Sequence, residues 1–488
     1  MAKLLLLAAV AWMQITPAYR AQQLNAEGVR LMQQNRPADA EAQFRQAVAA
    51  DPASIEAVTN LGVSIYQQGR FAESIPFFQQ AVAAHPHQAP LHNDLAQAFV
   101  RIGRPHDAAA EMARACDLDP KNPEYRRFLG DMLAEAKDDP ASEKQLRLAV
   151  QFAPQNADNW LSLAKELTRE DRRDEAKKNY LTSLKLNPRQ PDALRELGEI
   201  YSFEGDFPSA EESFRKAIAL DPSNAVLYAD LGAALLKSGN AEPAERELRE
   251  ATRLNSSLGP AHRDLGLALR QENKLDESVE ELRRAAALMP NDSNVHYQLS
   301  RSLRRAGKTP AAEKEAALSE QLGQKQKQAQ QILSLANEGL ALVDQGRSQQ
   351  GVEKINQALR LDPENLTAHF NLGLAELHLR HDDRAIAELQ KVLQLQPDMP
   401  AAHYQLGRAY FNKGDYSAAL AAFRRAAALI PGTAAVHNGL GVALAKSGDT
   451  PGATAELQLA RKLEPKKAAY AKNLACIEKA VPNCRLEP

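Results

Sequence analysis

Apolar residues recur at spacings of three and four through most of the chain, a pattern that is typical of amphipathic helices. In the stretch that ends at Pro222 the pattern predicts two helices, Pro191–Phe203 and Pro208–Leu220. Gly205 and Asp206 form the break between them, because glycine and aspartate favour turns. The same pair of helices follows in segment after segment, which predicts an all-α chain of helical hairpins.

The hairpins follow a repeat of 34 residues. Prolines mark its phase, at Pro52, Pro86, Pro120, Pro154, Pro188 and Pro222, then at Pro290, Pro363, Pro397, Pro431 and Pro465. A tiny residue stands 24 positions before each closing position, at Gly28, Gly62, Ala96, Gly130, Ala164, Gly198, Gly232, Gly266, Ser300, Gly339, Gly373, Gly407 and Gly441. A bulky apolar residue stands eight positions before it, as at Phe44, Phe78, Tyr180, Phe214 and Phe423.

Each of these positions has a packing role. Gly198 and Ala210 are small enough for the two helices of one hairpin to approach closely, and Phe214 fills the space beside them. Pro222 ends the second helix and sets the turn into the next hairpin. Because one hairpin cannot bury its apolar face alone, neighbouring hairpins must stack.

The sixth repeat reads Leu194, Leu197-Gly198, Tyr201, Ala210, Phe214 and Pro222. These residues resemble the tetratricopeptide repeat, whose pattern of Trp, Leu-Gly, Tyr, Ala, Phe and Pro also spans 34 residues. Only the fifth repeat keeps the tryptophan, as Trp160. The resemblance covers thirteen repeats and implies an α-solenoid: a right-handed superhelix of two-helix repeats, with the first helices on its concave side.

The ninth repeat departs from the pattern. Gln324 replaces its closing proline, five extra residues precede the next repeat, and the stretch from 324 to 331 contains no helix breaker. We therefore predict an over-long second helix that runs through Gly323. It divides the chain into nine repeats at 22–324, a helical insertion at 325–331 and four repeats at 332–465, with a capping helix near Ala468–Ala480 and a tail to residue 488. A tolerated insertion and a functional hinge are alternative interpretations.

The N-terminus resembles a secretory leader, with Lys3, the apolar run Leu4–Trp12 and small residues near Ala18 and Ala21. We expect a signal peptide at 1–21 and an exported, periplasmic or extracellular protein; the alternative is a cytoplasmic protein whose first residues cap the array. The apolar run is too short for a membrane span. Cys476 and Cys484 could then form a disulfide, and Cys116 is expected in the core.

The composition and the motifs argue against several functions. With 60 basic and 62 acidic residues the chain carries a net charge of −2, whereas proteins that bind nucleic acid usually carry a basic excess. The sequence contains no phosphate loop or nucleophile elbow and leaves no room for a catalytic domain beside the repeats. We predict half-buried packing roles for the six histidines that share one place in the repeat: His92, His262, His296, His369, His403 and His437. The predicted protein is not an enzyme and needs no metal or cofactor, and its oligomeric state stays open.

The resemblance also predicts which residues face the groove, namely those three before and one, four and five after the small position. In the fourth to sixth repeats they are of mixed charge: Asp131, Glu135, Lys165, Arg195 and Glu199. Farther along they form a basic cluster of Arg263, Arg270, Arg301, Arg304 and Arg305. Aromatic residues accompany it at Tyr297, Phe370, Tyr404 and Phe411, with Arg408 nearby.

Aromatic and arginine side chains dominate many interfaces. The sequence therefore predicts a scaffold that binds a protein or peptide partner, with an acidic or carboxylate-ending segment at the arginines and apolar anchors at Phe370, Tyr404 and Phe411. Alternatively, the arginines pair with acids of second helices, such as Glu277, Glu280 and Glu281. A different function, a small-ligand or glycan carrier or receptor module of the cell envelope, is the runner-up.

Overall fold

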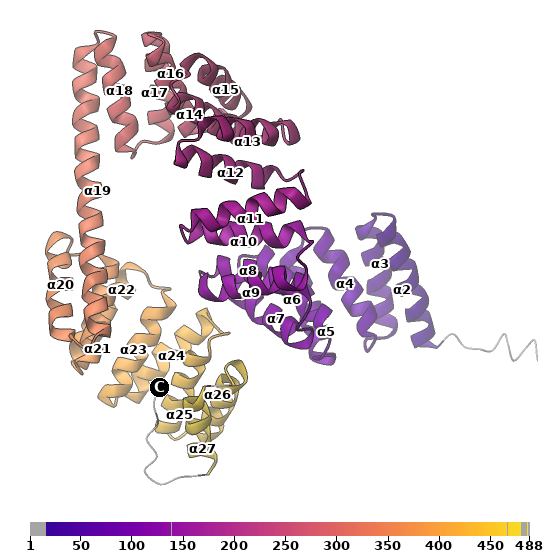
Figure 1. Ribbon diagram of the computed structural model, residues 1–488. Coiled ribbons are helices and arrows are strands. Elements are labelled where there is room, and N and C mark those ends of the chain that lie inside the picture. Colours follow the sequence, from indigo (N-terminus) through magenta and orange to yellow (C-terminus); the bar gives the residue numbers. More distant parts are fainter. Residues whose placement is uncertain (1–15, 138, 466, 480–485, 487–488) are drawn as a thin grey trace, which may run out of the picture. The chain divides into compact units, whose positions relative to one another are not determined.

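The computed structural model describes residues 16–137, 139–465, 467–479 and 486. In this part of the chain every regular element is a helix, and 26 helices follow one another from Pro17 to Glu478 (Figure 1). The helices group into two compact units: unit 1 is Met1–Pro290 with Arg301–Lys308, and unit 2 is Asn291–Ser300 with Thr309–Pro488. None of the described helices is both long and apolar enough to cross a membrane.

Unit 1 consists of paired helices, each packed against its partner in the hairpin and against the next pair. The first helices are α2 (Pro17–Gln33), α4 (Ile55–Gln67), α6 (Ala89–Arg101), α8 (Pro123–Glu135), α10 (Ala157–Arg169), α12 (Pro191–Glu204), α14 (Ala225–Lys237) and α16 (Gly259–Gln271). The second helices are α3 (Pro37–Ala50), α5 (Phe71–Ala84), α7 (Pro105–Leu118), α9 (Asp139–Phe152), α11 (Arg173–Leu186), α13 (Phe207–Leu220), α15 (Ala241–Leu254) and α17 (Leu275–Leu288). Consecutive first helices also contact each other, as α12 and α14 do.

Unit 2 contains a long helix. α19 runs from Thr309 to Asp344 without a break at Gly323, as the missing helix breaker predicts. The shorter helices are α20 (Ser348–Leu361), α21 (Leu366–His378), α22 (Asp382–Leu395), α23 (Pro400–Lys413), α24 (Tyr416–Leu429), α25 (Ala434–Lys446), α26 (Thr450–Leu463) and α27 (Ala468–Glu478), and α18 (Ser293–Arg305) is shared between the units. The domain boundaries at 324–331, the count of thirteen repeats and the right-handed superhelix stay predictions.

The small and the bulky position of each repeat meet as predicted. A Cβ added to Gly198 would lie 2.7 Å from Cε1 of Phe214, and one added to Gly407 would lie 2.7 Å from Phe423. Phe214 and Phe423 are almost completely buried. The bulky side chain therefore occupies the space that a side chain at the glycine position would need. This contact sets the distance between the two helices.

The turn inside each hairpin uses a left-handed residue. Gly205 has a φ of 82°, and the side chain of Asp206 caps the next helix by accepting a hydrogen bond from the Ser209 amide. The break predicted at Gly205 and Asp206 is therefore confirmed. The equivalent residues Asn35, Lys137, Asp171, Asn273 and Arg380 adopt the same region with φ between 57° and 62° although they carry side chains. The turn geometry is thus imposed by the packing of the helices rather than by glycine alone.

The ends of the chain are only partly described. Residues 1–15 of the predicted leader lie outside the described residues, and Pro17–Ala21 form the start of α2, where Ala21 is buried. Cys476 in α27 is disulfide-bonded, whereas Cys484 lies outside the described residues. Cys116 is buried as expected, and burial raises the pKa of its thiol to about 11.

The sequence predicted that all six shared histidines are half-buried packing residues, but this holds only for His403. Five of them are buried, and the Nδ1 atom of each lies 2.5–2.7 Å from a carboxylate oxygen of the glutamate 19 residues later, in the pairs His92–Glu111, His262–Glu281, His296–Glu315, His369–Glu388 and His437–Glu456. In four of them Nε2 faces a backbone carbonyl 2.7–3.1 Å away, six residues earlier. The pair ties the two helices of one repeat to the turn that precedes them.

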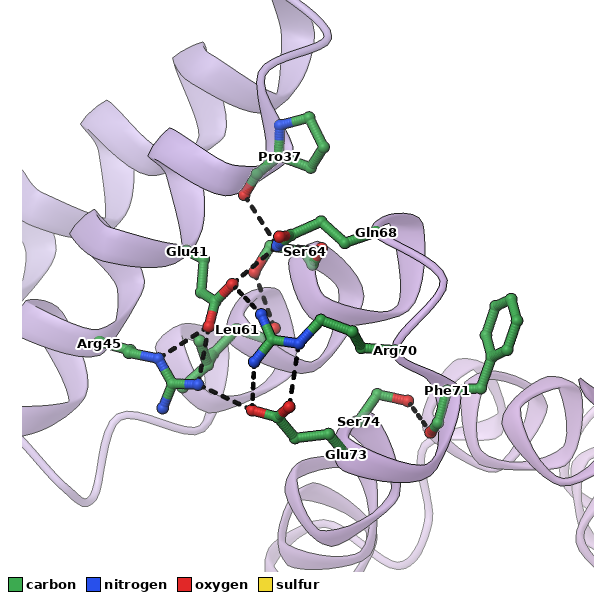
Figure 2. A network of polar contacts seen from close by, with 10 residues as sticks. All are labelled: Pro37, Glu41, Arg45, Leu61, Ser64, Gln68, Arg70, Phe71, Glu73 and Ser74. Carbon is green, nitrogen blue, oxygen red and sulfur yellow. Dashed lines mark hydrogen bonds and ion pairs between the residues drawn. The ribbon is translucent and has the colours of Figure 1, made fainter. Parts of the chain in front are cut away.

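A second polar device joins neighbouring repeats (Figure 2). Glu41 of α3 bonds Arg45 of the same helix, Gln68 at the end of α4 and Arg70 in the following turn, at 2.7–2.8 Å. Arg45 and Arg70 both reach Glu73 of α5. Burial alone would raise the pKa of Glu41, but the hydrogen bonds from Gln68 and Arg45 and the charge of Arg70 together lower it. The carboxylate is thus held charged between α3 and α5.

The same network, which we call the glutamate clasp, recurs at intervals of three repeats. Its members are Glu41, Arg45, Arg70 and Glu73, then Glu143, Arg147, Arg172 and Glu175, then Glu245, Arg249, Lys274 and Glu277. Each clasp joins the second helix of one repeat to the second helix of the next. Unit 1 therefore carries a longer period of 102 residues on top of the 34-residue repeat.

Replacing Gly198 by alanine should lower the stability by about 1–3 kcal/mol, because the new methyl group overlaps the ring of Phe214. The matched control is Gly323→Ala in α19, where a Cβ meets nothing within 4 Å and alanine should raise the stability by about 0.5–1 kcal/mol. Urea midpoints followed by circular dichroism measure both. If both substitutions shift the midpoint in the same direction, the close approach of the helices does not depend on Gly198.

His369→Ala should lower the stability by about 1–3 kcal/mol, because it removes the bond to Glu388 and leaves that carboxylate half-buried. His403 occupies the same place in the next repeat but has Ala422 where the glutamate would be, so His403→Ala should cost less. Glu388→Gln keeps the packing and removes only the charge. A pure packing role for His369 would leave Glu388→Gln as stable as the wild type in thermal unfolding.

Candidate functional site

The predicted basic cluster lies on α16 and α18, within unit 1. Nη1 of Arg270 lies 3.5 Å from Oγ of Ser302, and Arg305 donates to the backbone carbonyl of Arg270 at 3.2 Å and to Oδ1 of Asn273 at 3.3 Å. Arg301 and Arg304 are exposed on the same turns of α18. The structure thus brings Arg270 and Arg305 together at the C-terminal end of α16, where the helix dipole favours positive charge.

Several acids of α16 and α17 are engaged in specific pairs. Arg263 is bonded to Asp264, its neighbour in the chain, at 2.7 Å and 3.1 Å. The second-helix acids of the alternative interpretation pair as follows: Glu277 with Arg249, Glu280 with Arg284, and Glu281 with His262 and Arg284. The partners of these three carboxylates are thus residues of α15, α16 and α17.

The predicted aromatic anchors lie in unit 2. Tyr297 is 48% exposed, but Phe370, Tyr404 and Phe411 are half-buried and pack against the apolar cores of their repeats. The Tyr404 ring lies 5.8 Å from the Phe423 ring, and the Phe411 ring lies 5.4 Å from the Tyr416 ring. Arg408, on the same helix, donates to Gln405 at 2.8 Å. Only part of each half-buried ring is left for a partner.

A row of buried and half-buried acids lies on the first helices of unit 1, and the sequence analysis named only Asp131 among them. Two residues before the small position stand Asp94, Glu196, Asp230 and Asp264, and Asp131 lies one residue after it. Burial raises the pKa of Asp94 to about 6 and also raises the pKa of Asp131, Glu196 and Asp230. The regular phase of these acids was the signal that could have revealed them.

Arg195 organises the acids of two neighbouring repeats. Its guanidinium bonds Asp230 of α14 at 2.7 Å, lies 3.3 Å from Glu196 and also pairs with Glu199. One cation therefore serves three carboxylates, and the first helices α12 and α14 carry more negative than positive charge around it.

Three family models match the sequence. The model described as the cilia and flagella-associated protein 70 C-terminal domain matches residues 18–264, about half of the chain. Two models described as tetratricopeptide repeat match residues 337–400 with 404–468, and residues 383–421. The chain therefore belongs to the tetratricopeptide repeat family that these models describe.

Solved structures are similar at low sequence identity. The chain is 23% identical to MamA, with 34% of this chain and 96% of that chain covered and a TM-score of 0.32. It is 17% identical to a tetratricopeptide repeat protein from Parabacteroides merdae, with 51% and 99% covered and a TM-score of 0.43. It is 14% identical to a chain of the APC/C hetero-tetramer Cut9-Hcn1, with 96% and 99% covered and a TM-score of 0.36. No curated protein matches the sequence.

Asp94→Asn should stabilise the protein at neutral pH. Its pKa of about 6 in the fold lies above the ordinary value of 3.8, so the buried charge costs stability above about pH 6 and this cost disappears below about pH 4. We expect a gain of about 1–2 kcal/mol at neutral pH that fades as the solution is acidified. Thermal unfolding at stepped pH measures it. Asp107→Asn in α7 is the control and should gain nothing, because it loses the ion pair with Arg104.

Proposed function

We propose that this chain is a non-enzymatic scaffold that binds a segment of a partner protein along the face formed by its first helices. Most consecutive first helices contact one another, as α2 and α4 or α14 and α16 do, so their outward side chains lie in rows along each unit. Such rows suit an extended segment of another protein. Membership of the tetratricopeptide repeat family supports the same function.

One observation carries the proposal, namely the arginine-rich end of unit 1. Arg301, Arg304 and Arg305 are exposed on α18. A partner segment with acidic side chains or a terminal carboxylate would complement this surface, because guanidinium groups bind carboxylates through paired hydrogen bonds. We propose that this is where the partner's negative charge is recognised.

A carrier of small ligands or glycans is the second candidate. Clefts of about 400–440 Å³ lie along α10–α14, a volume within the range of small-molecule sites. Native mass spectrometry of the purified chain separates the two functions. A retained small molecule favours the carrier, whereas a co-purified protein favours the scaffold.

Arg301→Glu, Arg304→Glu and Arg305→Glu in one variant should reduce partner binding by about 10-fold or more, since three attractive charges become repulsive. The partner is first identified by crosslinking in the native host, and its affinity for purified variants is then measured by interferometry at low and high salt. Lys185→Glu, Lys216→Glu and Arg253→Glu on the second helices α11, α13 and α15 form a control with the same charge change. Equal binding by the two triple variants would remove the arginine site.

A further inference from the structure

Phe203 is an apolar side chain in an unusual place. It is 68% exposed, the largest exposed fraction among the bulky apolar residues of the described chain. It lies on α12 five residues after Gly198, at a position that the sequence analysis assigned to the groove, and it was not among the predicted binding residues. The guanidinium of Arg173 lies 3.8 Å from the centre of its ring and covers one face. An exposed aromatic ring that is held in place by stacking is a candidate anchor for a partner.

Two hollows flank this ring. The first, a cleft of about 440 Å³, is lined by α12 and α14 and contains Glu196, Glu199, Asp230 and Lys237 beside Phe203. The second measures about 420 Å³ and lies at the start of α11, where Asp171, Arg172, Arg173, Asp174, Glu175 and Glu204 line it. Phe203 therefore stands between two depressions that are both rich in charged side chains.

Both hollows carry excess negative charge. Among the residues that line the first hollow, Glu196, Glu199 and Asp230 give three negative charges, and Arg173 and Lys237 give two positive ones. Arg195, beside the hollow, bonds all three carboxylates. In the second, Asp171, Asp174, Glu175 and Glu204 give four negative charges against two from Arg172 and Arg173. A cation is the complement of both hollows.

The three carboxylates of the first cleft share one guanidinium, that of Arg195. Burial raises the pKa of Glu196 and of Asp230, and the charge of Glu199 raises that of Glu196 further, although Arg195 opposes both effects. A cation from a partner would bind most favourably at such partly buried acids, because much of the water around their carboxylates is already displaced. The apolar ring beside them restricts the partner to a segment that also carries apolar surface.

We propose that the cleft between α12 and α14 docks a protein segment in which a lysine or arginine lies next to an apolar side chain. The apolar side chain packs on the free face of Phe203, and the cation reaches Glu196 and Asp230. This proposal rests on the proposed function, because it uses the same face of unit 1. It differs in charge: the cleft binds a cation of the partner, whereas the arginine-rich end binds a carboxylate.

The experiment selects ligands without assuming a natural partner. Phage that display random short peptides are panned on the purified full chain, and the best peptides are measured by fluorescence anisotropy. We expect enriched peptides that combine lysine or arginine with a neighbouring apolar residue. Their affinity should fall about 10-fold or more in Phe203→Ala and in the double variant Glu196→Gln and Asp230→Asn. Phe152→Ala on α9, another exposed aromatic residue, should bind as the wild type does.

The remaining outcomes separate this proposal from the general function. If the enriched peptides are only acidic and bind less well to the Arg301, Arg304 and Arg305 variant, the scaffold function stands and the cleft proposal is overturned. Basic peptides that bind all variants equally would also overturn it. A dimer of the chain that depends on Phe203 in size-exclusion chromatography would show that a second copy occupies the cleft instead. Circular dichroism of each variant checks that the fold is retained.

Discussion

The close approach of two helices at a residue without a side chain is the constraint on which this structure depends. Wherever Gly198 and its equivalents stand, the bulky residue 16 positions later fills the space, and the two helix axes are held at one distance. Because the same contact recurs at a fixed phase, each hairpin presents the same faces to its neighbours. The rows of side chains along the first helices are therefore a consequence of core packing rather than a separately built site.

Polar contacts then specify how hairpins join. The histidine–glutamate pairs tie the first helix of a repeat to its second helix, and the glutamate clasps tie the second helix to that of the next repeat. Buried or half-buried ion pairs contribute little net stability once their desolvation is counted. Their geometric demands are strict, however, since Glu41 must meet three donors from two repeats at once. We infer that these contacts mainly select one arrangement of neighbouring repeats over slightly rotated ones.

The sequence predicted the fold closely and the surface only in part. The two helices around Gly205 were placed within one residue of α12 and α13, and the uninterrupted α19 followed from a missing breaker, because strict spacing leaves few alternatives. The pairing of His369 with Glu388 was missed, although their separation of 19 residues recurs in five repeats. The ion pair between Arg263 and Asp264 could not be predicted from the spacing of residues in the repeat. The two residues are neighbours in the chain, and only their side-chain conformers bring the charged groups together.

The order of charges along unit 1 has a consequence for any partner that follows the first helices. The acids Asp94, Asp131, Glu196 and Asp230 lie on α6–α14, whereas Arg270, Arg301 and Arg305 lie on α16 and α18. A segment laid along these helices would meet mainly acidic side chains over several repeats, with Lys165 and Arg195 among them, and then positive charge at the end. Reversing its direction would place like charges together, which costs binding energy. Because every hairpin packs in the same way, a few substitutions on the surface are enough to make this row of side chains favour one direction of the bound segment. The core does not need to change.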